Sequence, residues 1–150
     1  MKIYNMVSKF KRKYPWTIAF RLKKHAQVIE NIIDKDEEVY YTFCGQKNDT
    51  SMLFDSCVVA LTSKRIIVAE KRLLFGYYLI TISTKLFNDL TINSNIFWGR
   101  IEIDTVKENL HISNIDKRAM DEIETMIHEI VLKNKKRDEI EEKKELEKAE

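Results

Sequence analysis

Hydrophobic residues in the first quarter of the chain follow a helical period. After Pro15, apolar side chains recur on one face of a helix, as Ile18, Ala19, Leu22, Ala26, Ile29, Ile32 and Ile33. The pattern predicts an amphipathic helix over residues 16–33. Pro15 suits its first turn, where the missing N–H would be unpaired anyway. His25 lies at the edge of the apolar face, and we expect it to be packed and hydrogen-bonded.

From Glu38 onwards the period changes to two. Short runs of alternating β-branched and aromatic residues predict seven strands, at residues 39–44, 54–61, 65–70, 77–83, 88–94, 99–105 and 109–115. No gap between the runs is long enough for the helical crossover that parallel strands require. We therefore expect an antiparallel meander that closes into a barrel or folds into a sandwich, because its apolar face must be buried.

A second amphipathic helix follows the strands, with Asp116 as its predicted cap. Its apolar stripe comprises Ala119, Met120, Ile123, Met126, Ile127, Ile130 and Val131. The stripe ends at Leu132, and the isolated Ile140 and Leu146 do not keep a heptad register. We expect three parts: a basic arm with an amphipathic helix (1–36), a β domain (37–132), and a charged, solvated helical tail that frays (133–150).

Composition narrows the class of protein. The chain has 150 residues, of which 44% are hydrophobic and 33% charged, and no apolar run approaches the length of a membrane span or signal peptide. We expect a single cytoplasmic domain. Three glycines cannot build a phosphate-binding loop, and no His, Cys or acidic cluster has metal-ligand spacing. Cys44 and Cys57 are expected to be buried thiols. The sequence thus predicts no enzymatic activity, no metal and no cofactor.

The charge is distributed unevenly. Residues 1–33 hold eight basic side chains and one acid, whereas residues 34–116 hold nine basic and twelve acidic ones. Such an arm either contacts an anionic surface (lipid, nucleic acid or an acidic protein) or lies against its own body as a solvated end. We expect no nucleic-acid partner, because the β segment lacks the basic stripe that such readers show.

Seven antiparallel strands followed by one helix form the element order of a pleckstrin-homology-like (PH-like) domain. The segments EEVYYTF, VVALTSKRIIVAEKRLLFG and NSNIFWGRIEID, within residues 37–132, resemble bacterial PH-like domains. The resemblance implies a mainly β fold: a bent sandwich or barrel of seven antiparallel strands, capped by a C-terminal α-helix and preceded by an N-terminal amphipathic helix. It also implies a non-catalytic binding or assembly module, with a protein or a second copy as partner (a homo-oligomer).

Two apolar triplets stand beside the strands, Leu73-Leu74-Phe75 before Gly76 and Ile96-Phe97-Trp98 before Gly99. We expect both to fold back over the ends of the sandwich. The alternative is an exposed tip, which makes Leu73, Leu74 and Phe75 a candidate partner-binding loop.

A second function remains open, that of a peripheral membrane adaptor. The arm interleaves cations with aromatic residues, and each cation near an anionic leaflet contributes roughly 1 kcal/mol. Lipid binding is expected to be nonspecific, because the QKNDTS break between the first two strands holds only Lys47 as a cation. The candidate anionic-surface residues are Lys9, Lys11, Arg12, Lys13, Trp16, Lys71 and Arg72.

Overall fold

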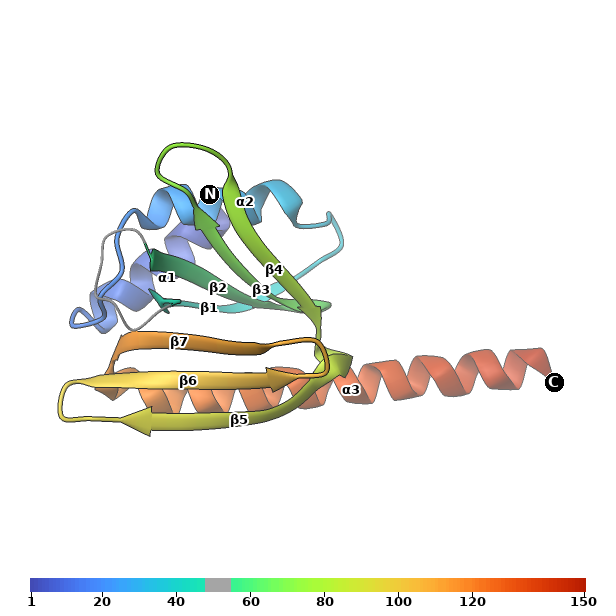
Figure 1. Ribbon diagram of the computed structural model, residues 1–150. Coiled ribbons are helices and arrows are strands. Elements are labelled where there is room, and N and C mark those ends of the chain that lie inside the picture. The colour runs from blue at the N-terminus through green and yellow to red at the C-terminus, as the bar shows by residue number, and fades with distance from the viewer. Residues whose placement is uncertain (48–54) are drawn as a thin grey trace.

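The structure is a computed structural model that describes residues 1–47 and 55–150 (Figure 1). Its helices are α1 (Lys2–Lys13), α2 (Leu22–Ile32) and α3 (Met120–Ala149), with short 3-10 turns η2 (Thr84–Leu86) and η3 (Lys117–Ala119). Its strands are β1 (Val39–Gln46), β2 (Ser56–Thr62), β3 (Arg65–Lys71), β4 (Tyr77–Ser83), β5 (Phe87–Ser94), β6 (Trp98–Thr105) and β7 (Asn109–Asp116). Most of the predicted polar break and the first residue of the predicted second strand lie outside the described residues.

The strands form one antiparallel sheet in the order β4-β3-β2-β1-β7-β6-β5, curled into a half-barrel, which confirms the predicted fold class. Two meanders, β1–β4 and β5–β7, meet where Gln46 of β1 pairs with Ser113 of β7. Backbones approach closely here: a Cβ on Gly45 would lie 2.7 Å from Ile112 Cγ2 and 2.8 Å from Ser113 O. Glycine is therefore required at the junction of the two meanders.

The helices cover different parts of the sheet. α1 and α2 pack together on the β1–β4 meander, whereas α3 runs along the β5–β7 side and projects beyond it (Figure 1). The predicted stripe of α3 is confirmed, since its residues from Ala119 to Val131 supply buried side chains to the core. The predicted cap Asp116 stands before η3, where its Oδ1 accepts from Arg118 N at 3.0 Å.

The predicted N-terminal helix has the wrong limits. Residues 2–13, read as an arm, form α1, and α2 begins only at Leu22. Ile3, Val7 and Phe10 are spaced for one helical face and are buried against the sheet, although lysines surround them in the sequence. Pro15 ends a helix instead of starting one, because a proline disfavours helical geometry in the residue before it. Tyr14 accordingly has φ −124° and ψ 69°.

The linker between α1 and α2 runs across the ends of several strands. Backbone Ile18 N donates to Asn114 O of β7 at 2.8 Å, and Phe20 N donates to Ser56 Oγ of β2 at 2.9 Å. At its end, an Arg21 guanidinium nitrogen donates to Lys71 O of β3 at 3.1 Å. The Trp98 ring N–H, next to the β5–β6 loop, also donates to Trp16 O of the linker. The linker, the β3–β4 loop and the β5–β6 loop thus lie along one end of the sheet, which we call the rim (Figure 1).

The charged C-terminal segment is helical along its length. α3 continues without a break to Ala149, with every residue from Glu139 onwards exposed. Its docked part extends past the predicted stripe, because Asn134 is buried and donates to Thr62 O at 3.0 Å. Beyond that anchor, oppositely charged residues four positions apart, such as Glu139 and Lys143, support the helix.

Candidate functional site

The basic residues of the predicted arm are partly engaged within the chain. Lys11 Nζ donates to the carbonyls of Pro15 and Thr17 at 2.9 and 2.5 Å, and Lys13 Nζ lies 2.6 Å from Glu122 Oε1. Lys9 and Arg12 are exposed. The neighbouring rings of Phe10 and Tyr14 are buried, so this segment does not present alternating cations and aromatic rings to solvent.

Trp16 belongs to a second cluster, at the β5–β6 end of the rim. Its ring is half-exposed and lies 5.2 Å from that of Phe97, while Trp98 Nε1 donates to Trp16 O at 2.8 Å. The triplet around Phe97 therefore covers the end of the sheet only in part. Ile96, at the turn itself, remains exposed.

The first apolar triplet does not fold back. Leu73, Leu74 and Phe75, here called the apolar tip, expose 51%, 82% and 85% of their surfaces. The loop is closed on itself by Arg72 N, which donates to Gly76 O at 3.1 Å, and Gly76 has φ +72°. A turn this short cannot bend its three side chains onto the sheet. The expectation that they cover the fold is therefore wrong, and the tip projects into solvent.

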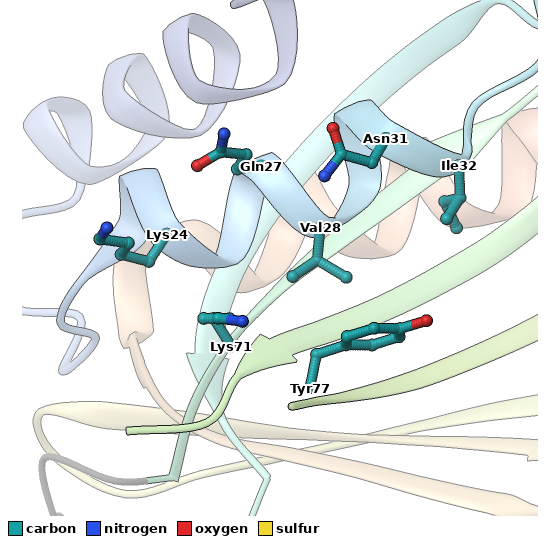
Figure 2. Close-up of a pocket in the computed structure, with 7 residues that line it drawn as sticks. All are labelled: Lys24, Gln27, Val28, Asn31, Ile32, Lys71 and Tyr77. Carbon is teal, nitrogen blue, oxygen red and sulfur yellow. The ribbon is translucent and has the colours of Figure 1, made fainter. Parts of the chain in front are cut away.

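Next to the tip lies a cleft of about 560 Å³ between α2 and the start of β4 (Figure 2). It is lined by Lys24, Gln27, Val28, Asn31, Ile32, Lys71 and Tyr77. Figure 2 shows the Lys71 side chain directed toward Val28 and the Tyr77 ring, with the Asn31 amide farther along α2, above Val28. Lys71 and Tyr77 flank the β3–β4 loop, so the cleft and the apolar tip form one continuous surface.

Two contacts from the start of α2 fix the backbone of Lys71. Lys71 N donates to His25 Nδ1 at 2.7 Å, and Arg21 donates to Lys71 O. His25 is buried, as predicted from its position on the helix. Burial, together with the charge of Arg21, lowers the pKa of His25 to about 4. The imidazole is thus neutral at pH 7 and accepts the bond that holds the end of β3 against α2.

The electrostatics around the cleft are positive. Lys24 and Lys71 line it, and the Arg21 guanidinium lies beside it, where it donates to Lys71 O. The carboxylates of the same elements are engaged elsewhere. Glu30 Oε1 accepts from Ile3 N at 2.5 Å, and Glu70, on the opposite face of β3 from Lys71, pairs with Lys47 at 3.3 Å. Burial raises the pKa of Glu70, against the charge of Lys47.

The two cysteines lie in the sheet, on β1 and β2. Cys44 and Cys57 are buried free thiols, as predicted, and burial raises the pKa of Cys44 to about 12. A thiol with so high a pKa is a poor nucleophile at pH 7. Residues 1–47 and 55–150 contain no group of three or more His, Cys, Asp or Glu that could hold a metal ion.

Sequence reasoning found only part of this surface. Lys71, Arg72 and the apolar tip were candidates, and the structure brings them together, whereas Lys9 and Arg12 lie apart on α1. The α2 side of the cleft was missed. Lys24, Gln27 and Asn31 stand at intervals of three and four on α2, so a search for polar stripes on that helix would have found them. Tyr77 carries no such signal.

Among the described residues, no helix has both the length and the apolar character needed to cross a lipid bilayer.

Comparison with known proteins identifies a family. A family model described as "Bacterial PH domain" matches residues 33–130. A DUF1696 family protein with a pleckstrin-homology domain from Shewanella loihica PV-4 is 12% identical, with a TM-score of 0.47, covering 71% of this chain and 92% of that one. A pleckstrin homology domain from Shewanella amazonensis SB2B is 17% identical, with a TM-score of 0.45, covering 71% and 85%. A comparison with curated proteins gave no match.

Proposed function

The chain belongs to the bacterial PH domain family, and from this premise we propose that it is a non-catalytic binding module that attaches to anionic membrane surfaces. One observation carries the proposal: Leu74 and Phe75 project almost fully into solvent from a closed turn with cations beside it. An exposed apolar surface of this kind typically contacts a membrane or another protein.

The shape of the tip favours a membrane over a protein partner. A stable protein interface needs about 800 Å² from each partner and is depleted of charge at its centre. Three side chains on one turn, next to Lys71 and Arg72, do not form such a surface. Burial of Leu74 or Phe75 among acyl chains contributes about 1.5–3 kcal/mol each. Each cation held near an anionic leaflet adds about 1 kcal/mol.

The rim as a whole suits this contact. Trp16, Phe20 and Ile96 are further exposed apolar side chains along the same end of the sheet. Trp side chains favour the interface between acyl chains and headgroups. The free end of α3 points away from the β5–β6 loop, so a membrane against the rim leaves the charged helix in water (Figure 1).

Vesicle sedimentation tests the proposal. The protein should sediment with vesicles of phosphatidylcholine mixed with phosphatidylglycerol, and less with phosphatidylcholine alone. The double variant Leu74→Ser/Phe75→Ser should lose most of this binding. Leu146→Ser, which changes an exposed leucine on α3, is the matched control and should bind normally. If the double variant still bound the vesicles, the apolar tip would not be part of the membrane contact.

A second candidate function is protein binding or self-association, and the sheet edges favour it. β4 and β5 are the outermost strands of the described sheet, and each pairs with a neighbour on one side. Exposed strand edges can accept a strand from another chain. Light scattering should then give a mass above the monomer that falls when a proline replaces Thr91 in β5. A monomer at high micromolar concentration would exclude self-association.

A further inference from the structure

We propose that the cleft between α2 and β4 binds a phosphate monoester, a group that phosphatidic acid and soluble glycerol phosphate share. The inference rests on the proposed membrane function only where it names a lipid as one source of the phosphate. It assigns the cleft a ligand, whereas the tip provides attachment. The site lies on the outer side of the β1–β4 meander, where α2 packs on β3.

Lys71 is the central observation. Its side chain is half-buried in the cleft and has no carboxylate partner among the described residues. Other lysines do pair: Lys47 with Glu70, and Lys64 with Asp34 and Asp36. Removing an ammonium from water without a counter-charge costs free energy, so a half-buried, unpaired lysine favours an anion.

The lining presents two cations to a ligand, the half-buried Lys71 and the solvent-exposed Lys24. Lys24 stands with Lys71 along the lining, and Glu30 and Glu70 are committed to other partners. A phosphate monoester carries a charge of about −1.5 to −2 at pH 7 and offers three acceptor oxygens. A carboxylate supplies one charge and two oxygens, so it would leave one of the two ammonium groups unneutralised.

The remaining lining fits the rest of such a ligand. The amides of Asn31 and Gln27 are hydrogen-bond donors for phosphate or glycerol oxygens. Val28 and the face of the Tyr77 ring provide an apolar wall for the carbon chain. Because Tyr77 begins the strand that leaves the apolar tip, a lipid whose phosphate lies in the cleft has its acyl chains beside Leu74 and Phe75.

A titration of the full-length ¹⁵N-labelled chain with glycerol 3-phosphate tests the cleft directly. We expect saturable amide shifts at Asn31, Lys71 and Tyr77, and none with glycerol. Lys71→Gln should weaken binding about tenfold, since hydrogen bonds to charged groups are the strong ones. Lys136→Gln, an exposed lysine on α3, is the control and should leave affinity unchanged. A second variant, Asn31→Leu, removes an amide donor without changing the charge and should also weaken binding.

Vesicle arms separate the two sources of phosphate. Phosphatidic acid, a monoester, should bind the wild type more tightly than phosphatidylglycerol, a diester, and Lys71→Gln should abolish that difference. Glycerol 3-phosphate shifts without vesicle binding would support the cleft and overturn the membrane function. Vesicle binding without amide shifts at the cleft would support the membrane function and overturn the cleft site. Shifts spread over all lysines, or an unchanged Lys71→Gln affinity, would overturn the proposed site.

Discussion

The chain contains two segments in which cations stand next to large apolar side chains, and the fold treats them in opposite ways. In α1, Phe10 is 5% exposed and packs among the rings of Tyr14, Tyr41 and Phe43. In the β3–β4 loop, Phe75 is 85% exposed. Composition does not distinguish the two segments, but spacing does. Apolar residues three and four apart share a helical face, whereas three consecutive ones in a tight turn cannot share one.

Large-to-small substitution of the two phenylalanines tests this contrast with the largest effect. Phe10→Ala should lower the free energy of unfolding by about 3–5 kcal/mol, because it leaves a cavity between α1 and the sheet. Phe75→Ala should change it by less than about 0.5 kcal/mol. Urea unfolding followed by circular dichroism measures both. Similar losses in the two variants would contradict the opposite roles of the segments.

The neutral imidazole of His25 holds the backbone at the base of the tip, whereas α1 contains no histidine. His25 has its pKa lowered to about 4 in the folded chain, from 6.5 when unfolded. The unfolded state therefore binds more protons between these values, so stability is lost as the pH falls through about 6.5 to 4. The loss is on the order of 3 kcal/mol at most.

Denaturant unfolding at several pH values measures this effect. In His25→Gln the slope in that pH window should flatten. His128→Gln, at an exposed histidine of α3, should keep the wild-type slope. Hydrogen exchange adds a local measure: the Lys71 amide, which donates to His25 Nδ1, should lose protection in acid before the amides of α1. Equal loss at both places would contradict a specific role of His25 at the tip.

Removal of charge gives the smallest effect and compares the two segments as membrane contacts. Lys71→Gln/Arg72→Gln and Lys9→Gln/Arg12→Gln each remove two positive charges. The first pair should reduce binding to anionic vesicles by about 1–2 kcal/mol, because these cations flank the inserting side chains. The second pair should cost less, and its effect should disappear at higher salt. A larger loss from the α1 pair would restore that helix as the main membrane contact.

The regular patterns of the sequence predicted most of the fold. The seven strands and the docked stripe of α3 follow from periods of two and 3.6, because each element has one dry face. α1 was missed because the spacing of Ile3, Val7 and Phe10 was hidden by the density of lysines around them. The break at Pro15 was assigned to the wrong helix, since a proline is compatible both with a first turn and with the residue after a last one.

The candidate site depends on contacts that a single sequence does not display. Lys71 and Arg72 were found because they lie next to the apolar triplet. Their relation to Lys24 and Asn31 arises only when α2 packs on β3, which brings together residues forty or more positions apart. Exposure of the tip depends on the turn that Arg72 N closes with Gly76 O. Gly45 likewise gave no signal, because its role appears only where β1 meets β7.

The continuity of α3 has a mechanical consequence. One uninterrupted helix carries both the stripe buried against the sheet and the eleven exposed residues from Glu139 to Ala149, which extend for about 16.5 Å at 1.5 Å per residue. The outer part therefore extends from two contacts with the body, the Asn134 bond to Thr62 O and the ion pair of Glu142 with Lys85 at 3.6 Å. A sideways force on its far end would turn the docked helix about these contacts, because no break in the helix separates the outer part from the buried stripe.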